Sequence, residues 1–101
     1  MKENVFVILY RWRVRPGYEE QFRLGWEALT DWLVKRGSLG SRLHVGNDGV
    51  WYSYAMWPSA EIRRAAFAAL PGNSDAEQMM AEATAERFQE VALEVVSDFL
   101  Q

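Results

Sequence analysis

The amino-acid sequence predicts a single α+β domain, in which helices cover one face of a four-stranded antiparallel sheet. Three observations lead to this prediction. The chain has 101 residues, enough for one domain over residues 1–101 and too few for two ordinary cores. Its contents of 50% hydrophobic and 25% charged residues are typical of globular proteins. Segments with the hydrophobic pattern of a strand also alternate along the chain with segments that have the period of an amphipathic helix.

The first half of the chain predicts a strand, a helix and a hairpin. Residues 5–14 are rich in β-branched and aromatic side chains and end before the breaker pair Pro16-Gly17, which predicts a strand. Residues 18–36 carry apolar side chains at steps of three and four, which predicts a helix. Residues 38–57 form two strand-like runs around the turn sequence 46–49, which predicts a hairpin.

The length of the hairpin turn decides which side chains share a face. A two-residue turn groups Leu39, Leu43 and Val45 with Tyr52, Tyr54 and Met56. The other face then holds Arg42, His44, Trp51, Ser53, Ala55 and Trp57. A three-residue loop would exchange the partners, since a slip of one residue turns every side chain of a strand over. Neither face is fully polar, so we expect the sheet to be covered on both sides.

The second half predicts two helices and a last strand. Ser59 is a natural N-cap for a helix over residues 59–70, which Pro71-Gly72 ends. Ser74-x-x-Glu77 resembles a capping box and opens a third helix over residues 75–87. Residues 91–100 predict the last strand, with a helical tail as the alternative. The resulting order, β-α-β-β-α-(α)-β, is the ferredoxin-like arrangement.

Composition and charge indicate which classes of partner the protein can have. Fourteen aromatic residues, five of them tryptophan, exceed what one small core conveniently holds, so we expect the surplus to line a ligand cavity or a subunit interface. The exposed apolar face of the predicted sheet favours a homodimer. The net charge of −3 argues against nucleic acid, and the apolar runs are too short to span a membrane. With no cysteine and one histidine, we expect no metal site. The absence of a signal-peptide pattern makes a cytoplasmic location the expectation.

Two segments carry a resemblance to a known family. Residues 37–61 (GSLGSRLHVGNDGVWYSYAMWPSAE) have a glycine-led strand, an acidic-glycine turn and an aromatic strand that ends in Trp-x-Ser. Together with the opening strand and the following RPGYEEQFRLGWEAL, this segment resembles the antibiotic-biosynthesis monooxygenase family. The resemblance covers most of residues 5–70, whereas residues 73–101 match only in general order.

The resemblance implies a dimeric α/β barrel and an oxygenase that needs no cofactor. Its substrate would be a phenolic or quinol-like aromatic, held between sheet and helices by Trp, Tyr, Asn and Arg side chains. A haem-degrading branch uses an Asn, a Trp and a helical His. Asn4 and Trp57 could match the first two, but His44 lies on a predicted strand, so haem degradation is not expected. The alternative function is a non-catalytic dimer that binds a small hydrophobic ligand.

Several side chains are candidates for the site. His44 could remove a phenolic proton, because its unperturbed pKa is near neutral, or it could simply pack at a dimer face. Trp57 could stack on an aromatic substrate or anchor the core. The remaining candidates, for substrate binding or for ordinary packing, are Tyr10, Arg42, Trp51, Tyr52 and Tyr54.

Overall fold

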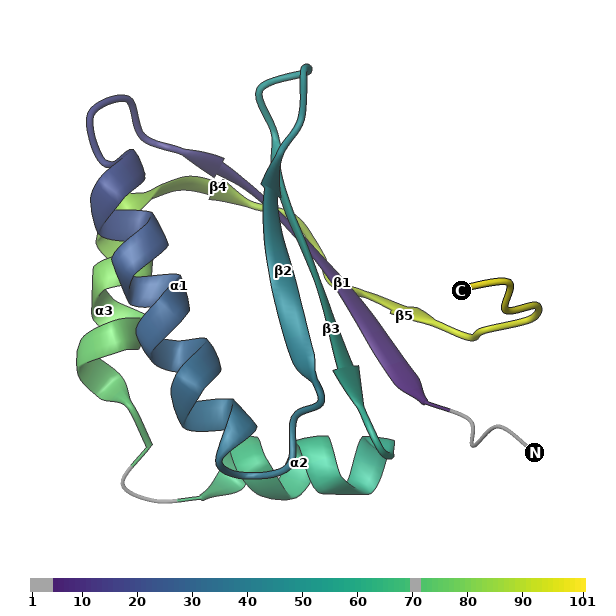
Figure 1. Ribbon diagram of the computed structural model, residues 1–101. Coiled ribbons are helices and arrows are strands. Elements are labelled where there is room, and N and C mark those ends of the chain that lie inside the picture. The colour runs from purple at the N-terminus through teal and green to yellow at the C-terminus, as the bar shows by residue number, and fades with distance from the viewer. Residues whose placement is uncertain (1–4, 70–71) are drawn as a thin grey trace.

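An antiparallel sheet with helices against one of its faces forms the body of the protein in a computed structural model that describes residues 5–69 and 72–101 (Figure 1). The elements follow in this order: β1 (Phe6–Val14), α1 (Glu19–Val34), β2 (Gly40–Val45), β3 (Trp51–Trp57), α2 (Ala60–Ala68), α3 (Ser74–Ala83), β4 (Thr84–Arg87) and β5 (Val91–Leu93). The strands lie in the order β2-β3-β1-β4, and β5 also pairs with β1. The α+β, ferredoxin-like fold predicted from the sequence is therefore confirmed.

The hairpin between β2 and β3 has a three-residue loop. The backbone N–H of Gly46 donates to Val50 O over 2.7 Å, and Gly49 has a positive φ of 79°, which glycine adopts without strain. The pairing consequently sets Arg42 opposite Tyr54 and His44 opposite Tyr52. The face grouping based on a two-residue turn was wrong, and the exchanged grouping is the one that the structure has.

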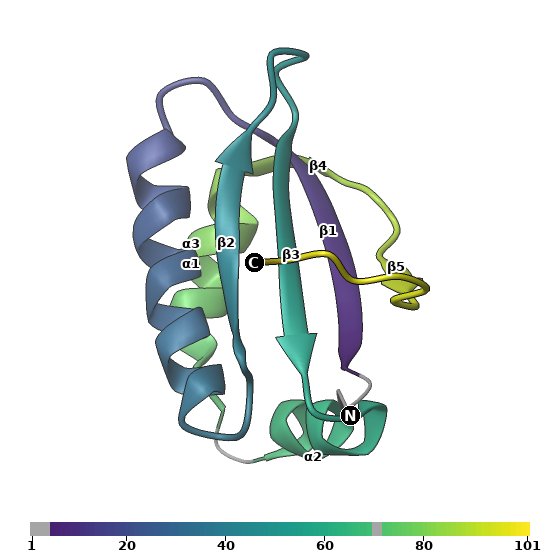
Figure 2. The ribbon, with the colours of Figure 1, turned by 45° about the vertical axis from the view of Figure 1, so that its right-hand side comes forward.

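The sheet thus has two different faces. One face, here called the helix face, carries alternate residues of β1, β2 and β3: Phe6, Ile8, Tyr10, Trp12, Ser41, Leu43, Val45, Trp51, Ser53, Ala55 and Trp57. The opposite side, here called the outer face, carries Val7, Leu9, Arg11, Arg13, Arg42, His44, Tyr52, Tyr54 and Met56. Helices α1 and α3 pack on the helix face, and α2 lies across its end (Figures 1 and 2).

The chain after α2 differs from the expectation. The side chain of Asn73, rather than Ser74, caps α3 by accepting the N–H of Ala76. The helix ends at Ala83 and not near residue 87, because residues 84–87 pair with β1 as β4. Only Val91–Leu93 of the expected last strand pairs, as β5, and residues 94–101 contain neither helix nor strand. Residues 70 and 71, where the predicted second helix ends, and Asn4 lie outside the described residues.

Two groups of buried side chains hold the helices to the sheet. Phe22 of α1 is fully buried, and the rings of Trp12 and Trp51 pack edge-on against it at 5.1 and 5.5 Å. At the other end, Trp57 packs with Ala55 and with Ala66 of α2. These clusters occupy the two ends of the helix face and leave its middle for the site.

No helix of the described chain packs on the outer face (Figures 1 and 2). The C-terminal segment, residues 94–101, extends on this side of the sheet, away from α1 and α3 (Figure 2). Its apolar side chains are exposed, including Val96 at 90% and Phe99 at 88%. In the described residues, no helix is long and apolar enough to cross a membrane, and the expected cytoplasmic location stays a prediction.

Candidate functional site

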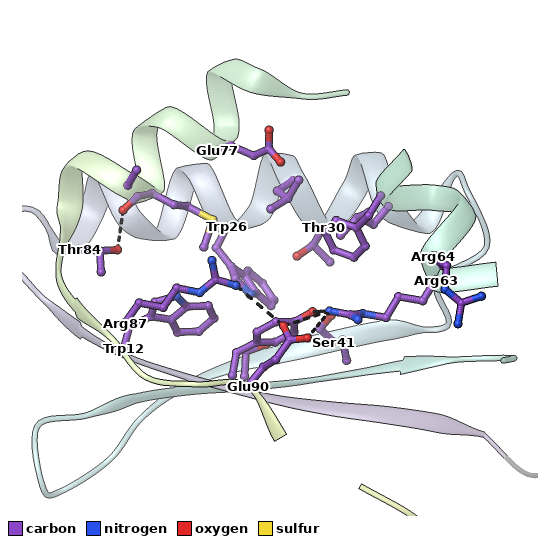
Figure 3. A pocket seen from close by; sticks show the side chains of 18 of the residues that line it. Trp12, Trp26, Thr30, Ser41, Arg63, Arg64, Glu77, Thr84, Arg87 and Glu90 are labelled. Atoms are coloured by element: carbon purple, nitrogen blue, oxygen red, sulfur yellow. Dashed lines mark hydrogen bonds and ion pairs between the residues drawn. The ribbon is translucent and has the colours of Figure 1, made fainter. Parts of the chain in front are cut away.

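A cavity of about 890 Å³ lies between the helix face and the three helices (Figure 3). Its walls come from every part of the fold. Trp26, Leu29, Thr30 and Leu33 come from α1, Ala60, Arg63, Arg64 and Phe67 from α2, and Glu77, Met80 and Ala81 from α3. The sheet contributes Phe6, Tyr10, Trp12, Ser41, Ser53 and Ala55, and β4 with its following loop contributes residues 84–87 and Glu90. A space of this size can hold a ligand of several rings.

The sequence of β3 explains why the sheet is hollow at this place. On the helix face this strand reads Trp51, Ser53, Ala55, Trp57, with large rings at both ends and small side chains between them. Ser41 lies opposite Ala55 on β2 and is small as well. Because the two tryptophans hold the helices at the ends of the strand, the small residues leave unfilled volume in the middle.

Aromatic and aliphatic side chains make most of the cavity apolar. The rings of Tyr10 and Trp12 stack on β1 with 5.7 Å between their centroids and 12° between their planes. Trp26 of α1 lies near Trp12 from the other side of the space (Figure 3). Flat walls of this kind favour a flat aromatic ligand.

One end of the cavity is charged. Nη2 of Arg63 donates to the hydroxyl oxygen of Tyr10 over 2.8 Å and to both carboxylate oxygens of Glu90 over 3.1 and 3.2 Å. Nη2 of Arg87 lies 3.9 Å from the same carboxylate (Figure 3). The side chain of Arg63 is only 20% exposed, whereas that of Glu90 is 38% exposed. A partly buried cation thus meets a tyrosine hydroxyl beside the aromatic walls.

The environment shifts the pKa values of both partners. Burial raises the pKa of Tyr10, and the hydrogen bond from Arg63 opposes this rise without cancelling it. Burial lowers the pKa of Arg63, but its hydrogen bond to Tyr10 and its pairing with Glu90 outweigh burial, so that the net shift is upward. At neutral pH, Tyr10 is therefore a neutral hydroxyl and Arg63 a cation.

Of the candidates from the sequence, Tyr10 is the one that lines the cavity. Tyr52, Tyr54, Arg42 and His44 belong to the outer face, where the rings of His44 and Tyr54 stack at 5.9 Å and Tyr52 donates to Asp48 over 2.5 Å. These four side chains are separated from the cavity by the sheet. The expectation that His44, Arg42, Trp51 and Trp57 share one face is thus corrected, because only the two tryptophans face the helices.

Both tryptophans of β3 belong to the packing around the cavity. Trp51 packs against Phe22, and Trp57 is 1% exposed and lies 6.2 Å from the ring of Phe67. The indole Nε1 of Trp57 is buried and has no hydrogen-bond partner among the described residues. These positions agree with the core-anchor interpretation of Trp57, and its role in chemistry stays a prediction.

The charged end of the cavity was not predicted from the sequence. Arg63 comes from α2, Arg87 from β4, where the third helix was expected to end, and Glu90 from the loop that follows β4. One signal was available for Arg87, since it is the single basic residue among seven acidic ones in residues 73–101. Within the described residues, no group of three His, Cys, Asp or Glu side chains could hold a metal ion.

Comparison of the sequence with protein-family models and with curated protein sequences gives no match. Solved structures do match the fold. SnoaB from Streptomyces nogalater, described as a cofactor-independent oxygenase, superposes with a TM-score of 0.82 at 14% identity, over 97% of this chain and 99% of its own. A candidate antibiotic biosynthesis monooxygenase from Nitrosomonas europaea gives a TM-score of 0.77 at 13% identity, over 95% and 94% of the two chains.

A third structure, a candidate antibiotic biosynthesis monooxygenase from Chloroflexus aurantiacus, gives a TM-score of 0.69 at 18% identity, over 93% of this chain and 95% of its own. Identities this low relate the folds and do not transfer an activity. The resemblance read from the sequence is thereby confirmed at the level of the fold. The chain has the ferredoxin-like fold of structures named as antibiotic biosynthesis monooxygenases.

Proposed function

We propose that this protein is a cofactor-independent monooxygenase that oxidises a phenolic or quinol-like aromatic in the cavity on the helix face. The observation that supports it most is the cavity itself, which combines stacked aromatic walls with a tyrosine hydroxyl and an arginine at one end. SnoaB, described as a cofactor-independent oxygenase, shares the fold and adds support.

The chemistry balances without a separate reductant. The substrate loses a proton from a phenolic hydroxyl or from a ring CH₂ that a conjugated carbonyl activates, and the electron-rich anion reacts with O₂ at a ring carbon that still bears hydrogen. A C–O bond forms and gives a peroxide. Cleavage of its O–O bond, with loss of the remaining C–H proton, leaves a carbonyl and releases water. One oxygen atom enters the product, the other becomes water, and the oxidised ring system supplies all four electrons.

The residues of the cavity contribute position, charge and dryness. Trp12 and Trp26 hold the ring system, and the apolar walls exclude water from the anion and the peroxide. Tyr10 and Arg63 stabilise negative charge on the substrate oxygen. His44, the base expected from the sequence, belongs to the outer face, so we assign the proton to water at the charged end of the cavity.

Oxygen uptake with anthrones and hydroquinones tests this proposal. We expect oxygen uptake above the buffer rate and incorporation of one ¹⁸O atom from ¹⁸O₂ into each product molecule. Tyr10→Phe and Arg63→Gln should each lose most of the oxygen uptake. His44→Ala is expected to keep the wild-type rate. Ligand binding without uptake across these substrates would contradict the oxygenase and favour the alternative, a binding protein for a small hydrophobic aromatic.

We also propose that a second copy of the chain covers the outer face. Tyr52, Tyr54 and Met56 form a half-buried apolar strip there, and the apolar side chains of the C-terminal segment are exposed beside it. The segment carries Glu94 and Asp98, whereas Arg11, Arg13 and Arg42 lie on the outer face, so the charges of two copies complement each other. A two-fold axis satisfies both surfaces at once.

A further inference from the structure

We propose that Tyr10, Arg63 and Arg87 form a subsite for one anionic oxygen, here called the oxyanion subsite, and that the ligand therefore binds as a phenolate or enolate. The inference rests on the proposed function for the class of ligand. It goes further by naming the ionisation state that is bound and the residues that select this state.

The subsite carries an excess of positive charge. Arg63 and Arg87 share the single carboxylate of Glu90, at 3.1 and 3.9 Å, so this group of three side chains carries one excess positive charge. Arg63 is mostly buried, where solvent compensates a cation poorly. An added anion is therefore favoured over a neutral molecule of the same shape.

The subsite also has an unused donor. The hydroxyl oxygen of Tyr10 accepts from Arg63, and within residues 5–69 and 72–101 no acceptor is recorded for its own hydrogen. Guanidinium groups only donate and Tyr10 has a proton to offer, whereas Arg63 and Arg87 share a single carboxylate, that of Glu90. A ligand oxygen that carries negative charge supplies a further acceptor.

Glu90 shows that the subsite can hold such an oxygen. Its carboxylate already accepts two hydrogen bonds from Arg63, and it is the more exposed partner of the pair. An arriving phenolate can share Arg63 while Glu90 turns toward solvent. Glu90 thus competes with the ligand, and its charge sets how strongly the subsite attracts an anion.

The oxyanion subsite lies beside the aromatic walls of the cavity. The Tyr10 ring stacks on Trp12, and the guanidinium of Arg63 lies 5.0 Å from the ring of Phe67. A ring that carries an oxygen bound at the subsite would therefore lie against the aromatic walls. The arrangement fits a hydroxyl attached to an aromatic ring.

Binding of 4-nitro-1-naphthol tests the inference, because its ionised form is coloured and the compound need not be oxidised. We expect the wild-type protein to lower the pKa of the bound naphthol and to bind the naphtholate more tightly than the methyl ether of the same naphthol. Arg63→Gln should weaken naphtholate binding about tenfold or more, as expected for a lost hydrogen bond to a charged group. The neutral ether should bind both proteins alike.

Glu90→Gln should change the affinity for naphtholate in the opposite direction, so it provides a second test if Arg63→Gln folds poorly. It raises the excess charge, so naphtholate should bind more tightly than to the wild-type protein. Arg15→Gln, an exposed arginine outside the cavity, is the control for net charge and should change nothing. Equal binding of naphtholate and ether, or weaker naphtholate binding in Glu90→Gln, would overturn the subsite. Naphtholate binding of the expected pattern without oxygen uptake on any substrate would instead contradict only the proposed function.

Discussion

Tyr10 lies where the apolar floor of the cavity meets its charged end. Its ring belongs to the stack with Trp12, and its hydroxyl accepts from Arg63. The neutral hydroxyl can donate to a ligand only while it keeps its proton. The pKa of Tyr10, which burial holds above the ordinary value of 10.0, ensures that it does so under physiological conditions.

The titration of Tyr10 is therefore a first prediction. A folded-state pKa above the unfolded value means that the folded protein holds the proton more tightly. The resulting contribution to stability is present below pH 10 and is lost as the pH rises through the folded-state pKa. The difference between the absorbance titrations of the wild type and of Tyr10→Phe at the tyrosinate band should show one tyrosine that titrates late. The difference removes the contribution of Tyr52, whose pKa its hydrogen bond to Asp48 also raises. In Arg63→Gln, Tyr10 should titrate later still, and an earlier titration would contradict the role assigned to Arg63.

At this scale the sequence indicated residue types better than residue positions. Tyr10 was identified as a hydroxyl-bearing side chain within the apolar strand predicted over residues 5–14. His44 and Arg42 were grouped with Trp51 and Trp57 because a two-residue turn places them on one face, and the three-residue loop ended by Gly49 reverses the pairing. The partnership of Arg63 with Tyr10 spans 53 residues of sequence and depends on where α2 packs. No local pattern contains that information.

Helices α1 and α3 approach each other at Gly25. A Cβ atom at this position would lie 3.0 Å from Cβ of Met79 and 3.1 Å from the carbonyl oxygen of Ala76. Both are atoms at or close to the backbone, so α3 would have to shift. Since α3 leads directly into β4, this contact also fixes one wall of the cavity.

Gly25→Ala should thus destabilise the protein, although alanine is ordinarily better than glycine in a helix by about 1 kcal/mol. We expect a net loss of about 1–3 kcal/mol in the free energy of unfolding, as for other overpacked contacts. Urea unfolding measures it. Ala28→Gly, on the exposed side of α1, reports the effect of helix propensity alone. A Gly25→Ala protein more stable than the wild type would show that the helices do not pack as described.

Strand β3 leads to a prediction that separates folding from binding. Ser53 is 1% exposed and lies between the two tryptophans on the floor of the cavity. Ser53→Leu fills empty volume, so the melting temperature should stay within a few degrees of the wild type while binding of 4-nitro-1-naphthol is lost. Ser53→Ala keeps the volume and should keep binding. Unchanged binding in Ser53→Leu would place the ligand elsewhere.

The elements of the first half could be predicted closely because their signals are local: Pro16-Gly17 ends β1, and Ser59 caps α2 by accepting the N–H of Ile62. The strand β4 could not be predicted in this way. Residues 84–87 (TAER) have little strand propensity, and they are extended because β1 offers an open edge with which their backbone can pair. The predicted cap of α3, Ser74, is one residue away from the observed cap, Asn73, because both residue types are good N-caps.

At the scale of the whole molecule, the outer face and the C-terminal segment define the expected assembly. The uneven distribution of charge along the chain fits this assembly, because the acidic C-terminal segment of one copy can lie against the outer-face arginines of the other. Light scattering should give twice the 11.7 kDa mass of the chain, and deletion of residues 94–101 should shift the mass toward the monomer. A full-length monomer at micromolar concentration would contradict the proposed assembly.

The cavity on the helix face is the feature on which the site, the function and the oxyanion subsite all depend. Its occupancy can be followed directly by NMR, because the five tryptophans give five indole N–H signals. Titration with 4-nitro-1-naphthol should shift the signals of Trp12 and Trp26, which line the cavity, and leave that of Trp32, which stacks beneath Arg36 outside it, unchanged. Shifts at Trp32 with none at Trp12 and Trp26 would contradict the account.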